Sequence, residues 1–290
     1  MFTRLFVTAV VVSALAVPWS PAPAGAIANG TGVKDGDHRF AVLLTMTGLP
    51  ADDGGTRDSW CSGALIAPRW VITAGHCFRD AGGRRVSRTV AERTVAVLDR
   101  TEPRGPGGRE AEVVAVVQAD GADVALAELR DPVTGVPTIR VAGDPPVRGE
   151  VLRLTGFGLT GADGGGSPPD RLQTGLFTVD AFGDSLVETS GREPHRDTSP
   201  CPHDSGGPYF RESPDAPPVL VAVVSSGPGC PHTGPDLSAR VDNLAGWITE
   251  TTTSQRSTVP VAAAGAGVGA AALVIVWAVL RRRSGTGGSP

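Results

Sequence analysis

Three short motifs in this 290-residue chain hold the residue types that combine in nucleophilic catalysis, namely a histidine, an aspartate and a serine. His76 ends the sequence Thr-Ala-Gly-His, Asp123 begins an apolar run that ends at Leu129, and Ser205 lies within Cys-Pro-His-Asp-Ser-Gly-Gly-Pro. A lone histidine is usually structural, and a lone aspartate before an apolar run is often a turn residue. Each motif alone is therefore only moderate support for catalysis, and the three together, in this order, indicate it.

Taken together, the three motifs resemble the chymotrypsin–trypsin family of serine proteases, whose catalytic residues follow the chain order histidine, aspartate, serine. The resemblance extends from Ile27 to Glu250. It implies an all-β fold of two perpendicular β-barrels with a C-terminal helix and with the active site in the cleft between the barrels. Further segments match landmarks of the family: Gly156-Phe-Gly158, Ser225-Ser-Gly227 and Gly246-Trp-Ile248.

The resemblance also implies a role for each motif residue. Ser205 is expected to be the nucleophile, and His76 the base that takes its proton and later the acid that protonates the leaving group. Asp123 is expected to hold the imidazole in the right tautomer, and Ser225 to help orient that aspartate. The predicted reaction is hydrolysis of peptide bonds in extracellular proteins through an acyl-enzyme intermediate, with no cofactor and no metal.

The chain start carries a second expectation. Residues 1–26 are predicted to be a secretory signal peptide, with Arg4, an apolar run and the small-residue site Ala24-Gly-Ala26. Cleavage after Ala26 would expose the ammonium group of Ile27, which in the resembling family pairs with the residue before the nucleophile. That residue is Asp204 here, and the buried pair is expected to shape the oxyanion hole.

The chain departs from the family pattern at the oxyanion hole. In the family, the backbone N–H groups of the nucleophile and of a glycine two residues before it form this hole; here the two residues are Ser205 and His203. A side chain does not remove the N–H, but it can disfavour the backbone conformation that aims it. A catalytically inactive pseudoprotease, acting as a surface binding module, is therefore the alternative function.

The primary specificity pocket leaves two substrate preferences open. The resemblance lines it with Ser199, Ser225, Ser226, Gly227 and Asp236. Ser199 stands where trypsin-like members carry an aspartate, which favours cleavage after an apolar residue. A carboxylate from Asp236 would instead receive arginine or lysine. Ser226 replaces a bulky aromatic residue common on the pocket wall.

All four cysteines lie between the two terminal segments of the chain. An even number in an oxidising compartment indicates disulfides, and the sequence alone permits three connectivities. The alternative is a zinc site built from two Cys-Pro-His tripeptides, which end at His203 and His232; if the cysteines are bridged, both histidines are bystanders. The resemblance favours two local pairs: Cys61 with Cys77, and Cys201 with Cys230.

Short strands are expected to position these residues, because the chain is rich in glycine, proline, valine and threonine and has 5% aromatic residues. Asp52–Ser59 is predicted to be a polar loop, and Asp242–Glu250 is the one convincing helix before the C-terminal region. Strands are predicted at Phe40–Thr45, Cys61–Ile66, Trp70–Ala74, Thr94–Leu98, Ala111–Val117, Asp123–Leu129, Val151–Gly156, Leu176–Val179, Leu186–Thr189, Pro208–Phe210 and Leu220–Val224.

The C-terminal region is predicted to anchor the protein in the cell membrane. A polar tether at 251–258 follows the protease domain at 27–250, and the uncharged segment 259–280 is long enough to span ~30 Å of hydrocarbon. Three arginines then open a cytoplasmic tail at 281–290, which places the protease domain outside the cell. A buried core helix or a removable sorting tail are the alternatives.

Charge and composition exclude one class of partner. The net charge is −4, and four of the 26 basic residues lie in residues 1–26 and 281–290, which hold no acidic residue, so the part between these two segments is more acidic than the whole. This argues against a nucleic-acid binder. It leaves protein or peptide substrates and the membrane as the expected partners. The Ala-, Gly-, Pro- and Arg-rich composition and the signal suggest a bacterial source.

Overall fold

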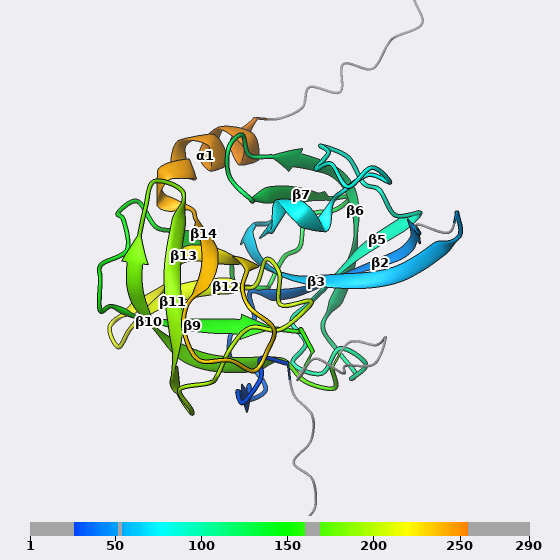
Figure 1. Ribbon diagram of the computed structural model, residues 1–290. Coiled ribbons are helices and arrows are strands. Elements are labelled where there is room, and N and C mark those ends of the chain that lie inside the picture. Colours follow the sequence, from blue (N-terminus) through cyan, green and yellow to red (C-terminus); the bar gives the residue numbers. More distant parts are fainter. Residues whose placement is uncertain (1–25, 52–53, 160–168, 255–290) are drawn as a thin grey trace, which may run out of the picture. The chain divides into compact units, whose positions relative to one another are not determined.

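The computed structural model describes residues 26–51, 54–159 and 169–254, which form two β-barrels followed by a short helix (Figure 1). Six strands close the first barrel in the order β2-β3-β4-β7-β6-β5. The strands are β2 (Ala41–Pro50), β3 (Thr56–Ala67), β4 (Trp70–Thr73), β5 (Arg93–Leu98), β6 (Arg109–Gln118) and β7 (Ala125–Leu129).

The second barrel closes in the order β9-β10-β11-β14-β13-β12, because β9 pairs with both β10 and β12. Two short strands lie outside the ring: β1 (Thr31–Gly32) pairs with β10, and β8 (Arg140–Val141) pairs with β13. The six strands are β9 (Val151–Gly156), β10 (Gln173–Phe182), β11 (Leu186–Glu193), β12 (Pro208–Ser213), β13 (Ala216–Ser226) and β14 (Asp236–Arg240).

Apolar side chains form separate cores inside the two barrels and a third cluster between them. Leu44, Leu65 and Leu98 belong to the first core, and Leu154 and Phe177 to the second. The third cluster draws on both barrels and on helix α1 (Ala245–Thr253): Phe40, Ile72, Leu126, Phe210, Val223 and Ile248. Burying this shared surface fixes one barrel against the other and so fixes the loops at their junction.

The predicted strands are all present, with three main differences from the prediction. The predicted loop Asp52–Ser59 was wrong from Thr56 onward, because β3 begins there as an exposed hairpin arm paired with β2. Both faces of that arm meet solvent, so it carries no apolar alternation. Strand β14 was not predicted. Helix α1 runs to Thr253, so the first three residues of the predicted tether, 251–253, are helical.

Two disulfides join the cysteines in the expected local pairing. Cys61 is bonded to Cys77 and Cys201 to Cys230. The prediction from the resemblance is confirmed, and the zinc alternative was wrong because none of the four sulfurs is a free thiolate.

The predicted membrane span at 259–280 and the predicted signal peptide, apart from Ala26, lie outside the described residues. Within residues 26–51, 54–159 and 169–254, no helix is both long enough and apolar enough to cross a membrane.

Candidate active site

The junction of the two barrels brings His76, Asp123 and Ser205 together. His76 lies on the 3₁₀ turn η1 (Gly75–Cys77) after β4, Asp123 precedes β7, and Ser205 precedes β12. His76 Nε2 lies 2.7 Å from Ser205 Oγ, and its Nδ1 lies 2.7 Å from Asp123 Oδ2. The three side chains therefore form one continuous hydrogen-bonded line.

Covalent and polar contacts hold the histidine turn in place. The bridge from Cys77 to Cys61 ties η1 to strand β3, and the Asp123 carboxylate also accepts the backbone N–H of His76 at 2.8 Å. A Cβ on Gly75 would lie 2.5 Å from Gln118 Oε1 and 2.9 Å from Arg85 Nη1, so a side chain there would displace these two side chains. The Thr-Ala-Gly-His motif thus supplies both a small residue for this turn and the histidine of the candidate triad.

Asp123 is ionised throughout the neutral range. Burial alone would raise the pKa of this carboxyl group, but hydrogen bonding to His76, the charge of His76 and a hydrogen bond from Ser225 together lower the pKa to about 2. The Ser225 hydroxyl donates to Asp123 Oδ2 at 2.7 Å, as the resemblance predicted for this serine.

His203 adopts the left-handed backbone conformation, with φ of +76°. Its ring stacks on Trp60 at 3.7 Å between centroids, and Nδ1 donates to the Trp60 carbonyl oxygen at 2.8 Å. The hydroxyl of Ser62 donates to the His203 carbonyl at 3.1 Å and accepts the Phe157 N–H at 2.8 Å. The expectation that His203 is a bystander was therefore wrong.

Trp60 and Ser62 were missed because nothing in their spacing marks them. Both flank Cys61 on β3, so the one signal was their closeness to a predicted disulfide. Trp60 Nε1 donates to the Phe157 carbonyl at 2.7 Å, and the Ser62 N–H donates to the Ser205 carbonyl at 2.9 Å. One short stretch of the first barrel thus touches the loops of the second that carry His203 and Ser205.

Asp204 is fully buried and accepts the backbone N–H groups of Gly158 at 2.7 Å and Cys201 at 2.9 Å. Burial raises the pKa of its carboxyl group to about 7, although the N–H groups of Cys201, Gly158 and Ile27 oppose the shift. Ile27 is buried beside it, as expected for the proposed pair. A Cβ on Gly158 would lie 2.4 Å from the Asp204 carboxyl carbon, which accounts for the glycine there.

Ser199 and Asp236 are both buried, and Asp236 lies against Gly227, where a Cβ would come within 2.0 Å of Asp236 Oδ1. His232, expected to be a bystander, contacts both residues: its Nε2 lies 3.2 Å from Asp236 Oδ1, and its backbone N–H donates to Ser199 Oγ at 3.3 Å. Burial raises the pKa of Asp236 to about 7, and the charge of His232 opposes the shift. His232 thus links Ser199 with Asp236, and Ser225 and Ser226 line the hollow beside His76.

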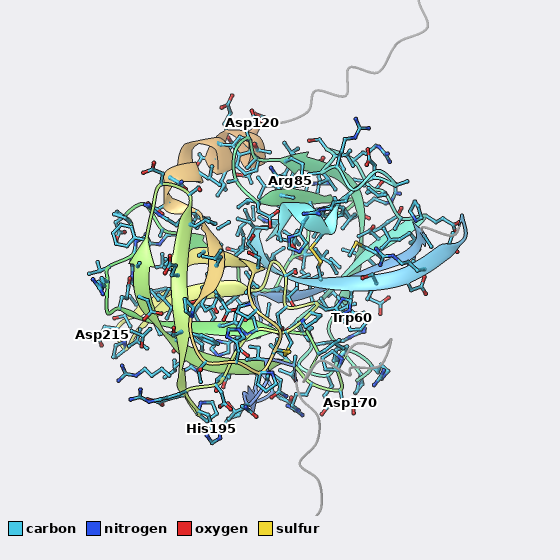
Figure 2. The ribbon with its side chains drawn as sticks, viewed as in Figure 1. Trp60, Arg85, Asp120, Asp170, His195 and Asp215 are labelled. Atoms are coloured by element: carbon cyan, nitrogen blue, oxygen red, sulfur yellow. A yellow bond between two sulfur atoms is a disulfide. The ribbon has the colours of Figure 1, made fainter. Side chains whose placement is uncertain are left out.

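Two hollows open beside the candidate triad. One, of about 550 Å³, is lined by His76, Asp123, Ser225 and Ser226 among others. The other, of about 210 Å³, is lined by His76, Ser205, His203 and the Cys61–Cys77 bridge. Trp60 and Arg85, which line different hollows, are labelled in Figure 2.

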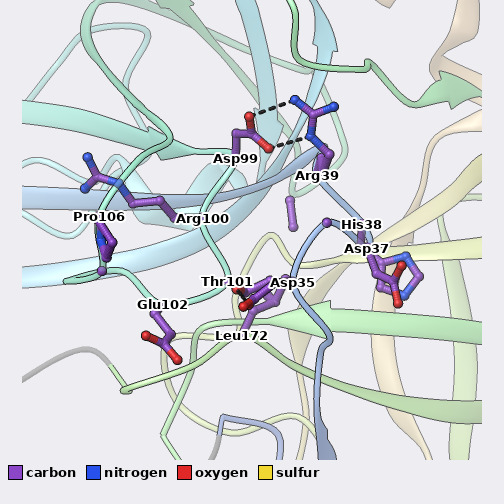
Figure 3. Close-up of a pocket in the computed structure, with 13 residues that line it drawn as sticks. Asp35, Asp37, His38, Arg39, Asp99, Arg100, Thr101, Glu102, Pro106 and Leu172 are labelled. Carbon is purple, nitrogen blue, oxygen red and sulfur yellow. Dashed lines mark hydrogen bonds and ion pairs between the residues drawn. The ribbon is translucent and has the colours of Figure 1, made fainter.

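A third hollow, of about 350 Å³, lies apart from the triad and holds none of its residues (Figure 3). Most of its charged groups are paired. Arg39 faces Asp99 through two hydrogen bonds of 2.5 and 2.8 Å. Asp35 and Glu102 both pair with Arg171, which lies outside the lining.

Comparison with known proteins agrees with this geometry. The family model described as Trypsin matches residues 27–248. Serine protease 1 of Homo sapiens is 29% identical over 213 residues, covering 66% of this chain and 79% of that protein. Serine protease 56 of Mus musculus is 29% identical over 262 residues, which cover 81% of this chain but 40% of that protein.

A third relative, transmembrane protease serine 9 of Rattus norvegicus, is 27% identical over 257 residues, covering 81% of this chain and 23% of that protein. The matched family segment includes the histidine turn, the aspartate and the serine loop, and it coincides with the two barrels. The chain therefore belongs to the trypsin family of serine-type endopeptidases.

Proposed function

We propose that the protein hydrolyses peptide bonds with Ser205 as nucleophile, His76 as general base and then general acid, and Asp123 as the group that orients and stabilises the imidazolium. The observation that supports this best is the unbroken line of hydrogen bonds from Ser205 through His76 to Asp123 and Ser225. Attack on the substrate carbonyl gives an acyl-enzyme and releases the amine, and water activated by His76 then releases the acid.

The oxyanion hole supports activity rather than the pseudoprotease alternative. Among the residues that the structure describes, neither the His203 N–H nor the Ser205 N–H donates a hydrogen bond, so both remain for a substrate oxyanion. The His203 ring stacks on Trp60, and the Ser62 hydroxyl donates to the His203 carbonyl. Both contacts stabilise the backbone conformation that a glycine would adopt at this position. Each such donor contributes on the order of 3 kcal/mol to transition-state stabilisation.

Activation would follow from cleavage after Ala26. Ala28 and Ser199 exchange backbone hydrogen bonds of 3.0 and 3.2 Å, which holds Ile27 beside Asp204. The new ammonium would pair with the buried carboxylate, whose charge is otherwise costly to bury. Because Asp204 lies between His203 and Ser205 in sequence, its position controls both donors of the hole.

The cleavage preference follows from Asp236. A carboxylate oxygen of this buried residue, Oδ2, has no hydrogen-bond partner among the described residues. Substrates with arginine or lysine before the scissile bond would supply the missing donor. The alternative, an apolar residue there, is favoured by Ser199 and by the partial neutralisation of Asp236 by His232.

We place the protease domain on the outer face of the cell membrane of a bacterium, after export by the signal peptide 1–26 and anchored by the segment 259–280. The two disulfides and the family support an extracellular domain. The name of one relative describes a transmembrane protease, which makes membrane attachment compatible with this fold.

The catalytic proposal is tested with a fluorophosphonate probe, which reacts with an activated serine. The wild-type protein should be labelled at Ser205, the Ser205→Ala variant should not, and His76→Ala should label far more slowly. Absence of labelling in folded wild-type protein with a free Ile27 terminus would reject the proposal.

A further inference from the structure

The 210 Å³ hollow touches Ser205 and His76 but contains neither Ser225 nor Ser226, which line the other hollow. Asp236, which the proposed function assigns to the residue before the scissile bond, lies against Gly227, the neighbour of Ser226, and does not line the smaller hollow. On this assignment, the smaller hollow is left for the substrate residues after the scissile bond, which leave with the amine.

Two arginines border this hollow without a partner. Arg57 on β3 and Arg79 after η1 both line it, and Arg79 lines the larger hollow as well. Within the described part of the chain neither guanidinium forms an ion pair or a side-chain hydrogen bond. Both side chains belong to exposed residues, so they can turn toward a ligand.

Among the residues that the structure describes, no carboxylate pairs with Arg57 or Arg79 in this hollow. The smaller hollow has no acidic residue in its lining, and Asp123 in the larger one is committed to His76 and Ser225. The neighbouring acids are used elsewhere: Asp58 accepts the Gly48 N–H at 3.0 Å, and Asp80 pairs with Arg84 at 2.9 Å.

The remaining wall suits the stem of an acidic side chain. Met46, Leu49, Trp60 and the Cys61–Cys77 bridge supply apolar surface in the same hollow. A glutamate could lay its methylenes on this surface and present its carboxylate to an arginine fork. The third arginine near the triad, Arg85, is already engaged by the Ala122 carbonyl and lies 3.7 Å from Asp123 Oδ1.

We propose that Arg57 and Arg79 form a subsite that selects substrates with an acidic residue one or two positions after the scissile bond. This inference rests on the proposed endopeptidase function and adds a substrate class to it. The chain as a whole is acidic, so the subsite is a local exception to its charge.

The test compares three quenched fluorescent peptides that differ only after the scissile bond, with glutamate, glutamine or lysine there. We expect kcat/KM for the glutamate peptide to exceed that for the glutamine peptide by roughly 5- to 10-fold, with a smaller ratio at high salt. Arg57→Gln combined with Arg79→Gln should bring the ratio near one. Arg57→Glu combined with Arg79→Glu should favour lysine.

Arg148→Gln is the matched control, because Arg148 is an exposed arginine that lines neither hollow, and it should keep the wild-type ratio. Equal rates for glutamate and glutamine peptides in an enzyme that cleaves both would overturn the subsite alone. If no peptide is cleaved, the dissociation constants of the same peptides for the Ser205→Ala variant are measured instead. Tighter binding of the glutamate peptide that disappears when Arg57 and Arg79 are also replaced by glutamine supports the subsite. Equal binding of the glutamate and glutamine peptides rejects it.

Discussion

The left-handed backbone of His203 is stabilised by the side chain of the same residue. A residue other than glycine in this conformation costs about 1–2 kcal/mol. The stack on Trp60, the hydrogen bond to the Trp60 carbonyl and the Ser62 hydroxyl offset that cost. Burial, with a smaller contribution from Arg57, lowers the pKa of His203, which favours the neutral ring.

This argument predicts different results for two substitutions of His203. His203→Ala keeps the strain and loses the stack, so kcat should fall roughly 10-fold as the oxyanion hole becomes less populated. His203→Gly removes the strain as well and should stay within about 3-fold of wild type. Steady-state kinetics on one peptide ester measures both. An alanine variant as active as wild type would contradict the role of the ring, and activity that appears only in His203→Gly would favour the pseudoprotease.

Among the elements, strand β3 joins the two halves of the site. It carries Trp60, Cys61 and Ser62, which contact the serine loop, the histidine turn and the His203 backbone respectively. The disulfide to η1 closes a loop with a sequence separation of 16. The position of His76 thus depends on a strand that contributes no catalytic group.

Replacing both Cys61 and Cys77 with alanine should therefore lower stability and activity together. Opening a loop of this length costs about 3 kcal/mol in the chain-entropy model. Urea unfolding measures the stability. The esterase kcat, measured without urea at a temperature at which the variant is fully folded, measures the activity of the site. The expected control is Cys201→Ala with Cys230→Ala, which should spare the His76 turn. Unchanged kcat in the folded Cys61/Cys77 variant would show that the bridge does not position the histidine.

The core strands could be predicted from apolar runs, and the candidate triad from three motifs, whereas the disulfide pairing also needed the family resemblance. Strand β14 and the first residues of β3 were not predicted as strands, because their own residues show no strand pattern. They are strands because β14 pairs with β11 and β13, and β3 pairs with β2. The contacts of His232 and Ser62 could not be predicted for a similar reason. Their partners, Asp236 and His203, come into reach only in the folded chain.

At the scale of the whole molecule, the proposed activation couples the Ile27 terminus to the site through Asp204. While residue 26 remains attached, the folded-state pKa of Asp204, about 7, lies above its ordinary value of 3.8. The folded state then holds a proton that the unfolded state loses. The stabilising effect of that proton is complete below pH 4 and is lost as pH rises toward 7.

A chain that begins at Ala26 should therefore lose stability between pH 4 and 7 relative to one that begins at Ile27, whose ammonium pairs with the ionised Asp204. The measurement is the urea midpoint of both forms across this range, at constant ionic strength. The gap between the midpoints should widen with pH. A gap that is constant or narrows would contradict the coupling of the terminus to Asp204.

The central claim is that Ser205 forms an acyl-enzyme with help from His76 and the two N–H donors. Rapid mixing with an activated ester tests it most directly. We predict a burst of alcohol product equal in amount to the enzyme, followed by slower turnover, with the acyl mass found on Ser205 and no burst in Ser205→Ala. A folded, Ile27-terminated protein that gives no burst and no acylated Ser205 would contradict the account.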